Sequence, residues 1–114
     1  MPDDKCTRNA QVPIRSYEWL EGMATKYSMP DLHKAFRCCI NWAAQTNTVP
    51  PPIGEMGESR TAPLCATAGQ WKWMDEMNCD AAALLAHCKD FVGSPWDHQK
   101  EEAIFKVTRL GRAN

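Results

Sequence analysis

The sequence predicts a mainly helical single domain with one short strand near its N-terminus. Two observations indicate this class: apolar side chains recur at helical spacing in several segments after residue 15, and strand-like alternation is found in residues 5–14. Hydrophobic residues make up 44% of the 114-residue chain and charged residues 24%, a composition typical of globular proteins. A chain of this length can bury a core without disulfides or metals.

The predicted strand has one apolar and one polar face. Ala10, Val12 and Ile14 share the apolar face, whereas Thr7, Asn9 and Gln11 share the polar one. Because Pro13 has no N–H to donate to a neighbouring strand, we expect the strand to end there or to lie at the edge of a sheet.

Two amphipathic helices are expected after the strand, which gives a strand–helix–helix unit over residues 5–45. The first has Ser16 as its expected N-cap and an apolar stripe of Tyr17, Leu20, Ala24 and Tyr27. The second begins at Ser28-Met29-Pro30-Asp31, a capping sequence with an early proline. Its stripe has the clearest helical spacing in the chain and consists of Leu32, Ala35, Phe36, Cys39, Ile40 and Ala43.

The rest of the domain, which we take to span residues 1–114, is predicted to be a connection followed by further helices. Residues 46–69 contain three consecutive prolines and show no periodicity, so an irregular connection is expected there. Residues 70–111 form a helical extension. Its helices are expected from about Gln70 to Met77, from about Cys79 to Val92, and from Ser94-Pro95 to Gly111.

A short internal similarity links the two helical regions. Trp19-Leu20-Glu21-Gly22-Met23 resembles Trp73-Met74-Asp75-Glu76-Met77, and a helix with a cysteine in its stripe follows each. The joining turns differ by about five residues. The extension is therefore either a degenerate repeat of the helical pair or an unrelated addition.

Charge and the cysteines constrain the location and the partners. Thirteen basic and fourteen acidic side chains give a net charge of -1, so any contact with a polyanion must be local. The N-terminus lacks the pattern of a signal peptide, and no apolar run reaches the length of a membrane span. We expect a cytoplasmic or nuclear protein without membrane contact, in which the six cysteines are mostly small buried side chains.

One family resemblance covers residues 7–45, about a third of the chain. The strand, helix and capped helix resemble the ribbon-helix-helix family of dimeric repressors. The segments that carry the resemblance are Tyr17-Glu18-Trp19-Leu20, Lys26-Tyr27-Ser28-Met29-Pro30-Asp31 and Lys34-Ala35-Phe36-Arg37. In that family, N-terminal strands of two copies pair into a ribbon that enters the DNA major groove. The resemblance implies a homodimer, or a higher homo-oligomer, that binds duplex DNA sequence-specifically and regulates transcription.

The resemblance also implies which residues contact DNA. Thr7, Asn9 and Gln11 would face base edges, where Asn and Gln can bind adenine through two hydrogen bonds. Phosphate contacts would come from Lys5, Arg8 and Arg15 and from N–H groups near Ser28 and Asp31. The sequence departs from the family in three respects: Pro13 shortens the ribbon, Asp31 places an acid at the phosphate site, and residues 46–114 have no counterpart.

The alternative to a DNA-binding regulator is a small oligomeric enzyme or ligand-binding protein with a pocket between subunits. Its candidate residues are His33, Arg37, Cys38 and His87. Compact catalytic motifs are absent from the sequence, which does not exclude an enzyme. His33, His87, His98 and the cysteines lack the spacing of a metal site, and we expect neither a metal nor a cofactor. Redox chemistry at Cys38-Cys39 is disfavoured, since no strong positive field activates either thiol.

Overall fold

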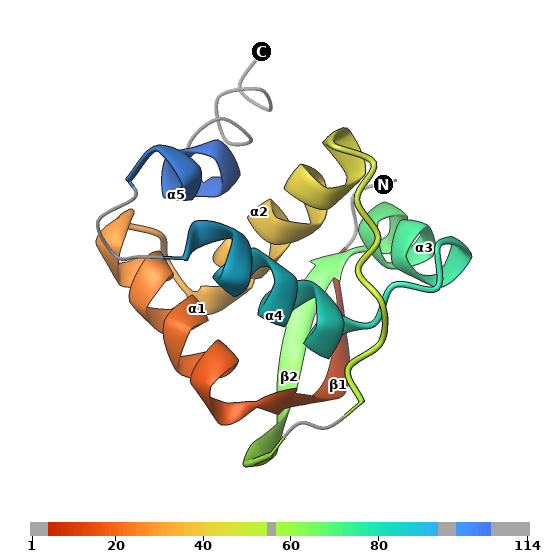
Figure 1. Ribbon diagram of the computed structural model, residues 1–114. Helices are drawn as coiled ribbons and strands as arrows, with labels where there is room; N and C mark the ends of the chain where they lie inside the picture. The colour runs from red at the N-terminus through yellow and green to blue at the C-terminus, as the bar shows by residue number, and fades with distance from the viewer. Residues whose placement is uncertain (1–4, 55–56, 94–97, 106–114) are drawn as a thin grey trace.

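The computed structural model describes residues 5–54, 57–93 and 98–105 (Figure 1). Helices predominate, so the predicted mainly helical class is confirmed. The elements in chain order are β1 (Lys5–Pro13), α1 (Ile14–Lys26), α2 (Leu32–Gln45), β2 (Ser59–Thr67), α3 (Ala68–Glu76), α4 (Ala81–Val92) and α5 (His98–Phe105). No helix in the described ranges is both long and apolar enough to cross a bilayer.

The order strand, helix, helix occurs twice in the chain. Each strand is nine residues long and runs directly into a helix. The offset along the sequence between the first residues of the strands, Lys5 and Ser59, equals the offset between Trp19 and Trp73. The similar sequences noted above therefore occupy equivalent positions, the first within α1 and the second in the last turn of α3 and its C-cap Met77. The repeated unit includes a strand as well as the helical pair.

The two strands pair with each other in an antiparallel ribbon. The register runs from Lys5 opposite Thr67 to Pro13 opposite Ser59, and at its centre Asn9 lies opposite Pro63. Asn9 and Pro63 are also equivalent residues of the repeat, since each is the middle residue of its strand. Because the central pair consists of equivalent residues, the register of the ribbon is symmetric about this pair, and a local two-fold axis of the ribbon passes between the two residues.

The turns between the helices repeat the same geometry. Ser28 and Asn78 both have a positive φ, of 55° and 58°, and the N–H of each donates to the carbonyl three residues earlier. Asp31 and Asp80 are the N-caps of the helices that follow, α2 and α4. The offset between equivalent residues is smaller here than in the strands because α3 has nine residues where α1 has thirteen, and the second turn is also shorter.

Both units contribute to one core. Cys39 and Cys88 stand at the same distance along the chain from their N-caps and are therefore equivalent. Both are fully buried, and their thiols share a hydrogen bond. The ring of Phe36 in α2 packs on Trp71 in α3 with centroids 5.6 Å apart. Residues 59–92 thus cover the apolar faces that residues 5–45 cannot close alone.

The structure corrects the prediction for residues 46–69. This segment contains β2, which was expected to be irregular. Its buried face consists of Ala62, Leu64 and Ala66, mostly small side chains that give a weak alternation. Pro63 is tolerated because its nitrogen lies on the edge of β2 away from β1, where no hydrogen bond to β1 is lost. Two residues on, the N–H of Cys65 lies on the same edge and donates to His33.

The expected strand pairing is also corrected. We expected β1 to pair with the same strand of a second copy, whereas its partner is β2 of the same chain. The physical reason is the repeat itself, since β2 supplies a second strand with the same inward alternation. The pairing that the sequence analysis assigned to a twin chain is therefore made within one chain.

The helix starts differ in detail from those predicted. Ser16 was expected to cap the first helix, but it lies buried within α1, and the N–H of Ile14 donates to the carbonyl of Glu58 instead. Asp31, rather than Ser28, caps α2 by accepting from Lys34 N. The third helix begins at Ala68, earlier than expected, because Thr67 and Gln70 form a capping box.

The last helix docks on the first unit. Glu101 of α5 is 1% exposed, and its carboxylate accepts hydrogen bonds from Lys26 Nζ at 2.5 Å and Tyr27 Oη at 3.1 Å. The ring of Phe105 lies between those of Trp19 and Tyr27, with centroids 5.7 Å and 5.6 Å away. The remainder of the expected helix, residues 94–97 and 106–111, lies outside the described residues, as does the side chain of His98.

The contact with α5 makes the stability sensitive to alkaline pH. Burial, and secondarily the hydrogen bond to Glu101, raises the pKa of Tyr27 from 10.0 to about 12. The neutral phenol is thus favoured in the folded state, so this contribution is complete below pH 10 and is lost as the pH rises through about 12. In urea denaturation, we expect the free energy of unfolding to fall more steeply above pH 10 in the wild type than in Tyr27→Phe. Equal slopes in the two proteins would contradict this.

Candidate functional site

The β1–β2 ribbon has one buried and one exposed face. Val12, Ala62, Leu64 and Ala66 of the inner face are 0% exposed and lie on the helical core. The outer face alternates with it and is polar. Its exposed members are Lys5, Thr7, Asn9, Gln11, Thr61 and Pro63, and its partly buried members are Pro13, Ser59, Cys65 and Thr67.

The polar side chains of the outer face are held at different places along the ribbon. Asn9 lies at the centre, opposite Pro63, and is exposed. Gln11 lies opposite Thr61, and its Nε2 donates to Ser59 Oγ at 2.8 Å. That hydrogen bond restricts the rotamers of the Gln11 amide while leaving it at the surface, which lowers the entropic cost of binding a ligand.

The outer edge of β2 is secured by α2. The N–H of Cys65 donates to His33 Nδ1 at 3.2 Å, and the carbonyl of Cys65 accepts from Arg37 at 3.4 Å. Gln70 Nε2 at the start of α3 donates to Asn41 Oδ1 of α2 at 2.8 Å. Three side chains of α2 thus hold β2 and α3 in place, which fixes the position of the ribbon on the core.

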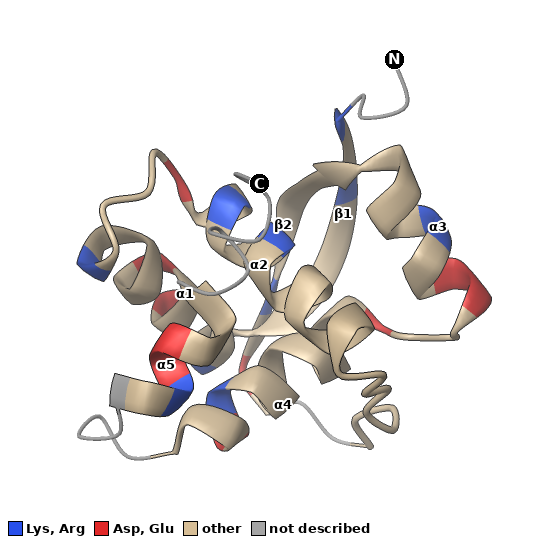
Figure 2. Cartoon of the chain, turned by 90° about the horizontal axis from the view of Figure 1, so that it is seen from above, with Lys and Arg blue, Asp and Glu red and all other residues tan. Residues whose placement is uncertain are grey.

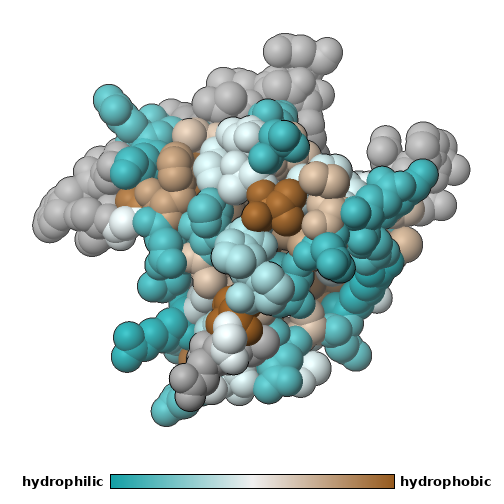
Figure 3. Space-filling view, turned by 45° about the vertical axis from the view of Figure 1, so that its right-hand side comes forward, coloured by the Kyte–Doolittle hydropathy of each residue, from teal (hydrophilic) through white to brown (hydrophobic). Residues whose placement is uncertain are grey.

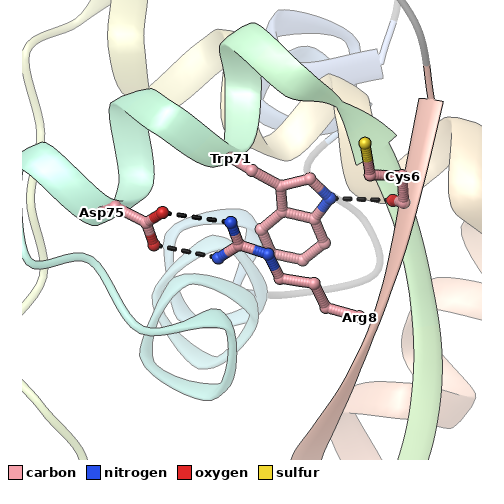
Figure 4. Close-up of polar contacts among 4 residues, drawn as sticks. All are labelled: Cys6, Arg8, Trp71 and Asp75. Carbon is pink, nitrogen blue, oxygen red and sulfur yellow. Dashed lines mark hydrogen bonds and ion pairs between the residues drawn. The ribbon is translucent and has the colours of Figure 1, made fainter.

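Arg8 connects β1 to α3 (Figure 4). Its guanidinium forms a two-pronged ion pair with Asp75, at 2.9 Å and 3.1 Å, and lies 4.7 Å from the centre of the Trp71 ring. Trp71 Nε1 in turn donates to the carbonyl of Cys6 at 2.8 Å. The hydrogen bond from Arg8 lowers the pKa of Asp75, and the hydrogen bond to Asp75 raises the pKa of Arg8.

This arrangement changes the interpretation of Arg8. We expected Arg8 to contact phosphate, whereas its guanidinium already has a carboxylate partner from a distant part of the chain. Both side chains are about half exposed, at 48% and 58%, so solvent screens the pair and its contribution to stability is modest. Arg8 therefore orients β1 against α3 more than it supplies an available positive charge.

Basic residues lie at both ends of the ribbon, and the positions of Lys and Arg along the chain are blue in Figure 2. Lys5 is exposed at the start of β1, and Arg15 is exposed just after its end. Arg60 of β2, which the sequence analysis did not single out, is exposed and lies 4.3 Å from the centre of the Tyr17 ring. Glu18 and Glu58 line a surface hollow together with Arg15, so the positive charge at that end is partly offset.

The start of α2 is less suited to phosphate than expected, and the start of α4 has the same kind of cap. Asp31 and Asp80 accept backbone hydrogen bonds from the third residue of their helices, at 3.1 Å and 3.4 Å. A carboxylate at the N-cap both uses an N–H group and repels a phosphate, although the helix dipole favours an anion there. Ser28 is exposed in the turn before α2.

Two of the four candidate residues for an enzyme pocket share a binding partner. His33 and Arg37 meet at the backbone of Cys65, while His87 stacks on Trp42 with ring centres 5.8 Å apart. Cys38 is only 5% exposed. Two hollows on the described surface are lined by other side chains, one by Arg8, Trp71 and Asp75 and the other by Met74 and Asn78.

Four of the six cysteines, Cys38, Cys39, Cys79 and Cys88, are buried, whereas Cys65 is partly buried and Cys6 is exposed. Burial, followed by the hydrogen bond with Cys88, raises the pKa of the Cys39 thiol well above its usual value. Burial likewise raises the pKa of Cys79 to about 11. A thiol with a raised pKa is a poor nucleophile and a poor metal ligand at neutral pH. Among the described residues, no three His, Cys, Asp or Glu side chains gather as a metal site.

The surface beside α3 and the connecting segment is mainly hydrophilic, with small and separate apolar patches (Figure 3). Among the described residues, the large apolar side chains classed as exposed are Val49 and Met77, each at 37%. No family model, curated protein or solved structure matches the chain.

Proposed function

We propose that the protein binds duplex DNA through the outer face of the β1–β2 ribbon, as a single-chain counterpart of a ribbon-helix-helix dimer. The observation that carries this proposal is the strand register. Asn9 and Pro63, equivalent residues of the two units, pair at the centre of an antiparallel ribbon. This pairing supports the proposal because the family forms its ribbon by pairing equivalent strands of two chains.

The shape and chemistry of the outer face support the proposal. The major groove of B-DNA admits a two-stranded β-ribbon, whose outward side chains can then reach base edges. Asn9 and Gln11 are exposed on that face, and an amide can bind adenine by donating one hydrogen bond and accepting another. Thr7 and Thr61 add hydroxyl groups at equivalent positions, because each is the third residue of its strand.

The flanking cations would provide the phosphate contacts. Three basic residues are exposed near the ends of the ribbon: Lys5, Arg15 and Arg60. Each would contact one phosphate. Each neutralised phosphate contributes about -0.9 to the slope of log K against log salt concentration. Three contacts give an expected slope of roughly -3, with affinity that falls as salt rises.

Salt titration tests this function. We expect duplex affinity to fall between about 50 mM and 200 mM salt with a slope near -3, and Lys5→Ala, Arg15→Ala and Arg60→Ala each to reduce the slope by about 1. Lys100→Ala is the matched control, since this residue lies on α5, far from the ribbon in Figure 1. Absent binding, or binding that does not change with salt, would overturn the proposal.

A further inference from the structure

The two units present different side chains on the outer face of the ribbon. Counted from the start of each strand, Thr7 is equivalent to Thr61, Asn9 to Pro63, and Gln11 to Cys65. Only the first of these pairs keeps the same side chain. The register of the two strands is symmetric, whereas the side chains of the outer face are not.

We infer that the ribbon recognises a non-palindromic duplex site in one orientation, with the amides of Asn9 and Gln11 contacting adenines. This inference rests on the proposed function and specifies its substrate. Two identical chains must offer the same side chains to both halves of a site, and their operators mirror that symmetry. A single chain with two different units has no such constraint.

The chemistry of the second unit supports recognition of bases mainly by the first unit. Pro63 has neither a backbone N–H nor a polar side-chain atom to offer a base. Cys65 is partly buried, its thiol is a weak donor, and its backbone groups are already bound by His33 and Arg37. By contrast, Gln11 is exposed and held by Ser59.

The residues that follow the two aspartate caps are asymmetric in charge as well. His33 and Lys34 follow the Asp31 cap of α2, whereas Ala82 and Ala83 occupy the equivalent positions after the cap of α4. α2 contacts β2 and α4 contacts β1, so these helix starts belong to opposite sides of the ribbon. A cation such as Lys34 is thus available on one side of the two-fold axis and not at the equivalent position on the other.

Selection of bound duplexes from a random pool tests the inference. For the wild type we expect an enriched motif without inverted symmetry, containing adenines whose preference is lost in Asn9→Ala and Gln11→Ala. A good amide–adenine pair discriminates by roughly tenfold or more. An inverted repeat selected by the wild type would overturn the inference and leave the proposed function standing. If the protein binds no duplex, or binds with an affinity that does not change with salt, the proposed function is overturned as well.

A symmetrised variant provides the sharper comparison. Pro63→Asn with Cys65→Gln gives both units the outward residues Thr, Asn and Gln, and we expect this protein to select an inverted repeat. The control, Pro63→Ala with Cys65→Ala, should keep the asymmetric wild-type motif. Thermal melting establishes that each variant folds. If the symmetrised variant does not fold, two other results decide the question: whether the wild-type motif lacks inverted symmetry, and whether Asn9→Ala loses the adenine preference.

Discussion

Phe36→Ala is expected to lower the free energy of unfolding by about 3–5 kcal/mol, the usual cost of truncating a buried phenylalanine. The side chain is 0% exposed and packs on Trp71, which belongs to the other unit. Its removal leaves a cavity between the two units, so both should be destabilised together. Chemical denaturation followed by tryptophan fluorescence and by far-ultraviolet circular dichroism measures this loss and its cooperativity.

The matched control for this substitution is Phe91→Ala. Phe91 lies on α4 and its ring centre is 4.7 Å from that of Trp42, but it is only partly buried, with Lys100 over its ring. Because part of the ring is already in water, its truncation should cost clearly less than that of Phe36. Equal losses, or separate transitions for the two probes in Phe36→Ala, would contradict a core shared between the units.

Asn9→Ala combined with Gln11→Ala is expected to weaken binding to the preferred duplex by about a hundredfold or more. Each amide–adenine pair contributes about 1–3 kcal/mol of discrimination, and the two residues contact different bases. Binding to unrelated duplexes should change little, since the phosphate contacts remain. Fluorescence anisotropy with both kinds of duplex measures the two affinities.

Gln99→Ala provides the control for the amide substitutions. Gln99 is exposed on α5, which is remote from the strands in Figure 1, so losing its amide should leave both affinities unchanged. A double variant that loses specific and non-specific binding equally would show that Asn9 and Gln11 act through the phosphate backbone or through folding. An effect of Gln99→Ala of similar size would show that the ribbon is not the binding surface.

Much of the first unit could be predicted from the sequence because its signals are local. The apolar spacing of Leu32, Phe36 and Ile40 identified α2, and Phe36 and Ile40 are indeed in the core. The polar alternation in residues 5–14 placed Thr7, Asn9 and Gln11 on one face, and the structure exposes all three. Periodicity of 2 or 3.6 residues is visible in a linear sequence and needs no knowledge of the rest of the fold.

The second strand and its pairing could not be predicted because their signals are weak or distant. The inner face of β2 contains two alanines, which resemble a connection as much as a strand, and Pro63 interrupts the pattern. The repeat was obscured because the loss of about one helical turn in α3 shifts every later position. The ion pair between Arg8 and Asp75 joins residues far apart in the sequence and depends on the folded arrangement.

The pairing of Asn9 with Pro63 is the point on which the account depends, and nuclear Overhauser spectroscopy measures it directly. In an antiparallel pair without mutual hydrogen bonds, as a proline requires, the Cα atoms are about 4.5 Å apart and their hydrogens face each other. We expect a strong cross-peak between the Asn9 and Pro63 α-hydrogens, and its absence from an isotope-filtered experiment on mixed labelled and unlabelled chains. A cross-peak found only between differently labelled chains, or none at all, would contradict a ribbon built within a single chain.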